Sequence, residues 1–304
     1  MLPLIEVQNF LQRAGRGEID SSRLEPLIEQ FGEDCKAAMR KQFSNRGGYK
    51  IRMSGVGRPL CQQQLEKQGH VQDVAYNDIV KFATGDLLEA FAVLVMRAAG
   101  LKVIDEQKKC SLELAGETVN GTLDVILEID GKEEVWDIKT ASPWSFENKF
   151  SGRGGYDVIK EDDPFGYVMQ GHLYGEADNS DFGGWIAINK VTGEFAVCEA
   201  PENQQKDRKE ILESANETIK SLKSNKKFEK LYGEITETYV PKSGKNKGLR
   251  IETGNTLLES ICGYCDFRKH CWPKSTLSEK VTSKAKSKPL VWYNKLKNTE
   301  VKNL

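Results

Sequence analysis

The sequence predicts a protein of the α/β class, and two changes in the spacing of apolar residues support that prediction. Between residues 79 and 98, apolar side chains recur mostly at three- and four-residue steps, which is the period of a helix with one buried face. Residues 121–129 and 134–140 are instead predicted to be strands, and Asp130-Gly131 between them is a typical hairpin turn. A second strand pair is predicted over 185–188 and 194–197, so helices and strands alternate along the chain.

The helix that follows the hairpin is predicted to begin at Pro164. Its inner face is expected to hold four side chains: Tyr167, Gln170, Leu173 and Tyr174. Residue 172, a histidine, lies off that face and is expected at the surface.

Three stretches outside the predicted strands have a distinct composition. Residues 141–163 are predicted to be loop-like, 202–231 a highly charged helix, and 241–248 a flexible basic loop. The tail from residue 274 carries eight lysines against two glutamates and is expected to be partly disordered. The chain as a whole is expected to divide into four segments: an N-terminal helical segment at 1–75, a core at 76–235, a cysteine segment at 236–275 and a basic tail at 276–304.

The composition is that of a soluble globular protein, with 38% hydrophobic and 29% charged residues in 304. Because the net charge is -1, any positive charge that binds nucleic acid must be local. No apolar run reaches the roughly 18 residues of a membrane span, and the N-terminus lacks the pattern of a secretory signal. We therefore expect a cytoplasmic protein with no membrane partner, whose seven cysteines are not a disulfide framework.

Two carboxylates stand where the predicted hairpin should be apolar. Asp124 and Asp137 each lie among buried-type residues, and Lys139 shares a strand face with Asp137. Burying a carboxylate costs several kcal/mol unless it is paired or binds a metal. Glu89, from the preceding helix, is a candidate third carboxylate.

Oxygen ligands of this kind suit Mg²⁺ or Mn²⁺, which can activate a water molecule against a phosphodiester, while a nearby lysine stabilises the developing charge. The alternative interpretation is a solvated hairpin edge with a cross-strand ion pair. In that case Glu89 is a solvent-facing helix residue, and Gln170 and Tyr174 are ordinary packing residues.

Three short motifs resemble those of the PD-(D/E)XK nuclease superfamily, in particular its RecB-like and Cas4-like branch. They are Gly121-x-x-Asp124, Asp137-Ile138-Lys139 and Gln170-x-x-x-Tyr174. The resemblance implies a mixed sheet flanked by helices. It also implies that Asp124, Asp137 and the backbone carbonyl of Ile138 are metal ligands, that Lys139 is the catalytic lysine, and that Gln170 and Tyr174 line the DNA path.

The motifs depart from that branch at two positions. The branch usually has glutamate where this chain has Asp137, and it usually has histidine in the helix where Glu89 follows Gly85. A glutamate there resembles phage-type exonucleases of the same superfamily, in which case the location is the host cytoplasm. The resemblance implies an exonuclease that acts on single-stranded DNA or DNA ends, in recombination, repair or DNA processing, alone or with a recombination or replication protein. The alternatives are a flap-cutting or endonuclease activity at the same site, or a non-catalytic DNA-binding subunit.

Three cysteines near the C-terminus have the spacing of metal ligands. Cys262, Cys265 and Cys271 form a C-x2-C-x5-C motif, and a tetrahedral metal or a cubane cluster needs a fourth ligand. Cys61 is the best candidate for it, and the rivals are Cys35, His70 and His270. Cys110 and Cys198 lie in strand-like segments and are expected in the core.

The same branch has proteins in which one upstream cysteine and a C-terminal C-x2-C-x5-C motif hold a [4Fe–4S] cluster. This resemblance implies an iron–sulfur centre on Cys61, Cys262, Cys265 and Cys271, which would join the N-terminal helical segment to the C-terminal cysteine loop. Zinc is the rival metal, and buried free thiols are the remaining alternative.

Several residues are candidates for contact with DNA. Arg52, Arg58 and Arg153 supply positive charge, and Tyr156 offers a ring on which a base could stack. The basic loop 241–248 and the lysine-rich tail either contact phosphates or are solvated flexible chain. No base-reading motif is found, so sequence-specific cleavage is not expected.

Overall fold

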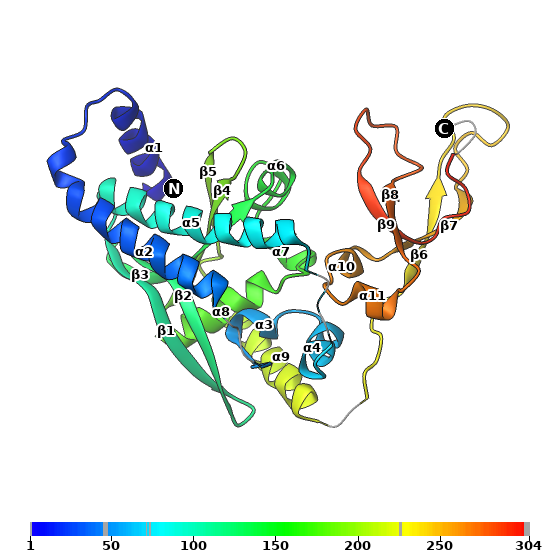
Figure 1. Ribbon diagram of the computed structural model, residues 1–304, viewed down its shortest axis with the longest axis horizontal. Coiled ribbons are helices and arrows are strands. Elements are labelled where there is room, and N and C mark those ends of the chain that lie inside the picture. The colour runs from blue at the N-terminus through cyan, green and yellow to red at the C-terminus, as the bar shows by residue number, and fades with distance from the viewer. Residues whose placement is uncertain (1, 45–47, 71, 73, 225–226, 301–304) are drawn as a thin grey trace. The chain divides into compact units, whose positions relative to one another are not determined.

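The computed structural model describes residues 2–44, 48–70, 72, 74–224 and 227–300 (Figure 1). The chain forms two compact units. The first unit consists of Met1–Arg58 and Ala75–Ser224, and the second of Pro59–Val74 and Asn225–Leu304. This division differs from the four expected segments, because a short piece of the N-terminal part folds with the C-terminal residues.

The first unit contains a five-stranded mixed sheet, as the α/β prediction requires. Its strands lie in the order β1-β2-β3-β4-β5, and only β3 and β4 are parallel neighbours. The strands are β1 (Val103–Leu114), β2 (Glu117–Ile129), β3 (Lys132–Ala141), β4 (Asp181–Asn189) and β5 (Phe195–Glu199). The predicted hairpin is β2–β3, and the predicted second strand pair is β4–β5.

The helices of the first unit pack around this sheet. Their bounds are α1 (Leu2–Gly15), η1 (Ser21–Arg23), α2 (Glu25–Phe43), α3 (Met53–Val56), α5 (Tyr76–Ala98), α6 (Pro143–Ser145), α7 (Tyr156–Glu161), α8 (Tyr167–Asp178) and α9 (Gln205–Lys223). Among the described residues, every helix is too short or too polar to cross a lipid bilayer.

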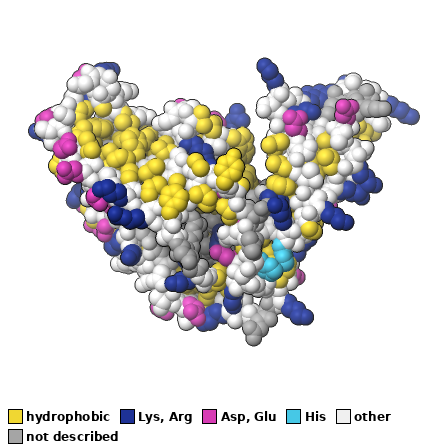
Figure 2. Space-filling view, viewed as in Figure 1, with side chains coloured by type: hydrophobic (Ala, Val, Ile, Leu, Met, Phe, Trp, Pro, Cys, Tyr) yellow, Lys and Arg dark blue, Asp and Glu magenta, His cyan; other side chains and the backbone are white. Residues whose placement is uncertain are grey.

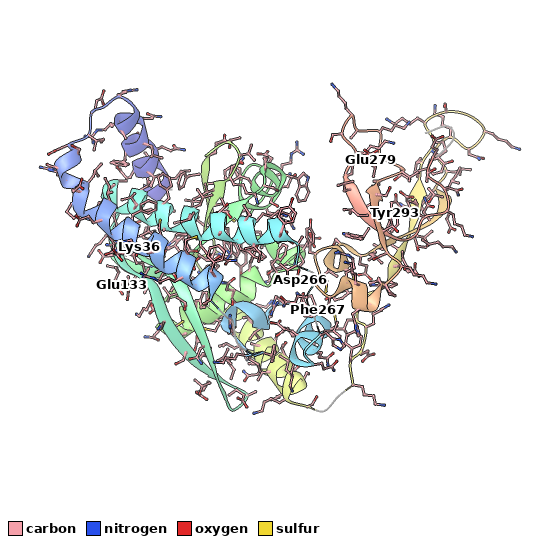
Figure 3. The ribbon with its side chains drawn as sticks, viewed as in Figure 1. Lys36, Glu133, Asp266, Phe267, Glu279 and Tyr293 are labelled. Carbon is pink, nitrogen blue, oxygen red and sulfur yellow. The ribbon has the colours of Figure 1, made fainter. Side chains whose placement is uncertain are left out.

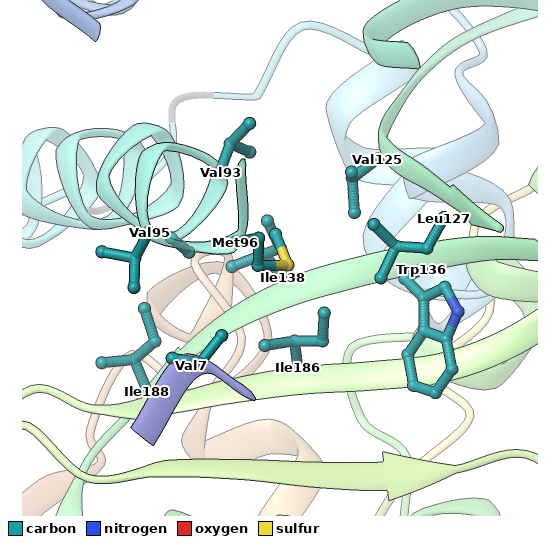
Figure 4. Packing of buried hydrophobic residues seen from close by; sticks show 11 residues of the cluster. Val7, Val93, Val95, Met96, Val125, Leu127, Trp136, Ile138, Ile186 and Ile188 are labelled. Carbon is teal, nitrogen blue, oxygen red and sulfur yellow. The ribbon is translucent and has the colours of Figure 1, made fainter. Parts of the chain in front are cut away.

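Helix α5 covers one face of the sheet and explains the helical spacing of the sequence. Its Val93 and Met96 pack against Ile138 of β3 and Ile186 of β4, and Val7 of α1 completes the cluster (Figure 4). Burying each such side chain contributes about 1.5–3 kcal/mol, so the cluster fixes α5 against the strands.

The segment that was predicted to be loop-like contains three helical pieces, so that prediction is wrong. They are α6, a π-helical turn η2 (Phe146–Phe150) and α7. Phe146, Phe150 and Tyr156 are all buried in one cluster with Trp185 of β4. Aromatic burial thus orders a segment whose glycines and acidic residues suggest a loop.

The predicted boundaries of two helices need correction. The charged helix α9 ends at Lys223 and not near residue 231, because Ala215, Ile219 and Leu222 are its last buried residues. The helix predicted to begin at Pro164 begins at Tyr167, where the Asp163 carboxylate accepts the N–H groups of residues 167 and 168, both at 2.9 Å.

The second unit contains a four-stranded antiparallel sheet in the order β6-β7-β9-β8. The tail, expected to be partly disordered, supplies two of these strands, and Tyr293 in β9 is fully buried (Figure 3). Residues 301–304 of the tail lie outside the described part of the chain. The Tyr293 hydroxyl donates to the buried carboxylate of Glu237 at 2.9 Å. The strands are β6 (Glu234–Tyr239), β7 (Ile251–Leu258), β8 (Thr276–Glu279) and β9 (Leu290–Lys295), and the short helices are α4 (Leu60–Lys67), α10 (Ser260–Gly263) and α11 (Arg268–Cys271).

Candidate active site and cysteine pocket

The β2–β3 hairpin brings the two aspartates together. The regular ladder between these strands ends at the pair Val125 and Trp136. Beyond it, the Asp124 carboxylate replaces a backbone acceptor and receives the N–H of Ile138 at 2.8 Å. Asp137 points to the same place and is 1% exposed. The strand alternation that the sequence showed therefore puts both carboxylates on one face.

Lys139 lies against these aspartates. Its Nζ is 2.5 Å from Asp137 Oδ2, 3.5 Å from Gln170 Oε1 and 4.7 Å from the centre of the Tyr167 ring. At this distance the ammonium group and Asp137 form a close ion pair. Burial alone would lower the pKa of Lys139, but the charges of Asp137 and Asp124 raise it above its ordinary value. The lysine is therefore a fixed cation.

Glu89 of α5 is the third carboxyl group at this place. Burial raises the pKa of Glu89 to about 7, and the charge of Asp137 contributes to the increase. Burial also raises the pKa of Asp124 well above its usual range, and the negative charges of Glu89 and Asp137 raise it further. Three acidic groups thus oppose one another's ionisation beside Lys139, and the charge of Lys41 also acts on Glu89. Such an arrangement favours the uptake of a cation.

An open pocket of about 610 Å³ leads to Glu89, Ile138 and Lys139. Three basic side chains at its rim are exposed to solvent: Lys41, Arg52 and Lys81. Phe82, 47% exposed, lines the same pocket, whose carboxylates are Asp86 and Glu89. Asp124 lines a second pocket of about 420 Å³, which it shares with Glu89 and Lys41.

The Gln-Tyr motif of α8 faces the same site. The Gln170 amide donates to the Tyr174 hydroxyl at 3.4 Å, while its oxygen accepts from Lys139. The Tyr174 ring also explains why the Gly121-x-x-Asp124 motif begins with glycine. A Cβ at position 121 would lie 2.5 Å from Cε1 of Tyr174. Any larger residue at position 121 would displace this tyrosine.

The structure does not place every expected residue at this pocket. Arg52 lines it, whereas Arg153 is exposed in the loop before α7 and Arg58 is partly buried at the end of the first unit. Tyr156 is only 6% exposed and packs on Trp185, with ring centres 5.8 Å apart. It is a core residue, so the expectation that it stacks on a base is wrong.

His172 is also in the core, contrary to the expectation of a surface residue. It is 1% exposed, and its Nε2 lies 2.7 Å from the Tyr156 hydroxyl, which donates to Asp207 Oδ2 at 3.1 Å. Burial lowers the pKa of His172 to about 4, so the ring is neutral near pH 7. Its partners come from α7 and α9, which no local pattern in the sequence could identify.

Sequence reasoning missed several residues around the carboxylates. Lys41 and Lys81 line the pocket from α2 and α5, and Gln107 of β1 donates its side-chain amide to Glu89. Gln107 has a positive φ of 47°, which is unusual for a residue with a side chain. The basic last turn of α2, with Arg40 and Lys41, could have suggested the first of these, whereas no local signal points to Lys81.

The four cysteines of the predicted cluster line one pocket within the second unit. Cys61 comes from α4, Cys262 from α10, Cys265 from the connecting turn and Cys271 from α11. Burial raises the pKa of each of these thiols. The charge of Cys61 raises the pKa of the other three further, in keeping with the pocket that the four residues share.

The rival ligands lie elsewhere. Cys35 belongs to α2 in the first unit. His70 and His270 face each other with ring centres 4.2 Å apart, outside the lining of the thiol pocket. Cys110 in β1 packs in a core cluster, and Cys198 in β5 is 4% exposed, in keeping with the expectation for both.

Two cations fasten the loop that carries the cysteines. Lys230 donates to the Cys271 carbonyl at 3.0 Å and lies 3.4 Å from the centre of the Trp272 ring. Arg268 donates to the Gly263 carbonyl at 2.8 Å and lies over the Trp292 ring at 3.4 Å. The positive charge of Lys230 partly counteracts the rise in the pKa of Cys271 that burial causes.

In the part of the chain that the structure describes, no three His, Cys, Asp or Glu side chains stand in an arrangement that could already hold a metal ion. The carboxylates are turned toward protein partners, namely Ile138 N–H for Asp124, Lys139 for Asp137 and Gln107 for Glu89. The donor types nevertheless fit the expected groups: hard oxygens with an unpartnered Asp137 Oδ1 in the first unit, and four thiols in the second.

Comparisons with known proteins add little. No family model and no curated protein matches the chain. Among solved structures, the chain is similar to the crystal structure of SSO0001, with 16% sequence identity and a TM-score of 0.41 over 79% of this chain and 94% of that one.

Proposed function

We propose that the chain is a metal-dependent DNA nuclease of the PD-(D/E)XK type, which hydrolyses phosphodiester bonds with Mg²⁺ or Mn²⁺. One observation carries the proposal. Glu89, Asp124 and Asp137 act on one another beside Lys139, and two pockets reach this set: one of about 610 Å³ lined by Glu89 and Lys139, and one of about 420 Å³ lined by Glu89 and Asp124. A structural ion pair would need one carboxylate, whereas three carboxyl groups here oppose one another's ionisation, and a divalent ion would offset that repulsion.

The residues divide into ligands and positioning groups. Asp124, Asp137, Glu89 and the Ile138 carbonyl would hold the ion, which supplies Lewis acidity toward the scissile phosphodiester. Lys139 stays charged because the neighbouring carboxylates raise its pKa, so it acts as a hydrogen-bond donor and not as a base. It can therefore orient the attacking water and stabilise negative charge that develops on the phosphate.

Gln170 and Tyr167 keep the ammonium group in place. The amide oxygen of Gln170 accepts from Lys139, and the Tyr167 ring lies against the same cation. The basic rim residues Lys41 and Arg52 would bind phosphates on either side of the scissile bond.

The proposal is tested with end-labelled single- and double-stranded DNA and with closed circles, in Mg²⁺ or Mn²⁺. Lys139→Ala should slow cleavage by about 10²–10³-fold, because a preorganised charge donor is lost. Lys132→Ala is the matched control, since Lys132 lies on the same strand but is exposed. Equal rates for Lys139→Ala and the wild type would refute the assigned site. Digestion of linear DNA but not circles indicates an exonuclease, and cutting of circles indicates the endonuclease alternative.

For the second unit, we propose that Cys61, Cys262, Cys265 and Cys271 hold a [4Fe–4S] cluster, with zinc as the alternative. Support comes from four thiols that line one pocket, the donor number that both groups require. Anaerobic purification should give a brown protein that contains iron and sulfide. A colourless protein that contains zinc and no iron would decide for the alternative.

A further inference from the structure

The two units carry opposite charges. The second unit, residues 59–74 and 225–304, contains 18 Lys and Arg residues against 10 Asp and Glu residues. The first unit contains the other 26 basic and 35 acidic residues. A chain with a net charge of -1 thus consists of a basic unit of +8 and an acidic unit of -9. Figure 2 shows mostly Lys and Arg among the charged side chains of the second unit.

The basic residues of the second unit gather in two loops of its sheet. The loop between β6 and β7 carries Lys242, Lys245, Lys247 and Arg250, and the loop between β8 and β9 carries Lys280, Lys284, Lys286 and Lys288. No acidic residue lies in either loop. Figure 1 shows both loops projecting from the sheet, on the side away from α10 and α11. The lysine-rich segments are therefore ordered connections of one sheet and not a free tail.

Most of these side chains are exposed and have no ion pair with a residue that the structure describes. Six of the lysines are exposed, at positions 242, 245, 247, 284, 286 and 288. None of the six has an ion pair among the residues that the structure describes. In the first unit, by contrast, Lys108 pairs with Asp178 and Lys149 with Asp162. Unpaired ammonium groups on two loops of one sheet retain their counterions, which a bound polyanion would release.

We propose that these two loops form a docking surface for the sugar-phosphate backbone of DNA. The inference rests on the proposed nuclease function, because a site in a unit of net charge -9 repels a polyanionic substrate. A nuclease on such a unit needs attraction from another part of the chain, and the second unit supplies it. Because the loops offer ammonium groups and no base-reading motif, the contact is independent of DNA sequence.

A membrane of anionic lipids is the rival partner for a lysine-rich surface. Stable binding to a lipid surface needs an apolar face beside the basic one. The β6–β7 loop exposes Val240 and Leu249, and the β8–β9 loop exposes Leu290. These apolar side chains lie only at the ends of the loops, whereas the lysines occupy the middle of each, which favours a phosphodiester backbone.

The test measures binding separately from cleavage. The full-length chain with Lys139→Ala is mixed with fluorescently labelled single- or double-stranded DNA in EDTA, and anisotropy is followed over a salt series. One variant replaces Lys242, Lys245 and Lys247 with glutamine, and a second replaces Lys284, Lys286 and Lys288. The matched control replaces three exposed lysines of α9 in the first unit: Lys206, Lys209 and Lys220.

Each loop variant should bind DNA about tenfold more weakly near 0.1 M salt, and its slope of log affinity against log salt should fall by up to about 3. The control should stay within about twofold of the parent. Matching lysine-to-arginine variants should bind like the parent, which excludes a loss of fold as the cause. Loop variants that bind DNA like the parent would overturn the proposal.

The two proposals fail separately. If DNA binds through the loops but no divalent ion supports cleavage by the wild type, the nuclease proposal fails and the docking surface stands. If the wild type cleaves and the loop variants bind normally, the docking surface fails alone.

Discussion

The carboxylate pocket and the thiol pocket each gather four reactive side chains, but by different means. In the first unit, Asp124, Asp137 and Lys139 take their places from the pairing of β2 with β3. In the second unit, the cysteines lie on helices of four to eight residues and on a turn, and buried Phe267 between them anchors the turn (Figure 3). Regular pairing fixes the first pocket, whereas the second depends on a few local contacts.

The charge states of the two pockets also differ. The carboxylate pocket is open, and its rim is basic. The lining of the thiol pocket consists of the four cysteines, mostly apolar residues and two cations, Lys230 and Arg268. Burial raises the pKa of the thiols, so protons must leave when a metal enters. An open oxygen site suits an exchangeable ion that meets substrate, and a closed sulfur site suits a permanent structural centre.

The largest expected effect comes from removing one charge of the carboxylate pocket. Asp137→Asn should reduce cleavage by about a thousandfold and weaken Mn²⁺ binding, because a hard anionic ligand is replaced by a neutral amide. Asp130→Asn is the control, since it makes the same change in the turn of the same hairpin, where φ is 52° and asparagine is tolerated. Rate assays and calorimetric Mn²⁺ titration compare the two. Equal losses would show that the hairpin and not the charge matters.

The thiol pocket should respond to a single sulfur in a different way. Cys265→Ser should remove bound iron or zinc and lower the thermal stability of the second unit, because a four-ligand site loses its closure. Cys35→Ser should leave the metal content unchanged, since Cys35 lies in α2. Metal analysis and thermal unfolding measure both. The reverse pattern would assign the fourth ligand to Cys35 and break the comparison between the two pockets.

The sequence predicted the carboxylate pocket better than its surroundings for a physical reason. A strand places alternate residues on one face, so Asp137 and Lys139 could be paired from their spacing alone. The burial of Tyr156 and His172 could not be predicted in this way, because their shared partner Asp207 lies on a helix more than thirty residues further along the chain. Local pattern carries no information about such distant contacts.

The C-terminal strands illustrate the same limit. The lysines around β8 and β9 suggest a solvated tail, yet Tyr293 is buried beside Glu237 of β6, which lies 56 residues earlier. The opposite charges of the two units were hidden for a related reason, since residues 59–74 must first be known to fold with the C-terminal part. The net charge of the whole chain follows from its composition, but the net charge of each unit could not be calculated before the limits of the units were known.

The smallest expected effect concerns how the cysteine loop is held. Lys230→Gln removes a cation that binds the Cys271 carbonyl and the Trp272 ring. A cation–π contact of this kind is worth about 1 kcal/mol, so a chelator should strip the metal roughly fivefold faster. Lys230→Arg should restore the wild-type rate, and Lys227→Gln, a change at an exposed neighbour, should have no effect. If Lys230→Gln lost metal no faster than the wild type, the metal ligands alone would hold the thiol pocket. The thiol pocket would then not depend on this local contact, and it would differ less from the carboxylate pocket that strand pairing fixes.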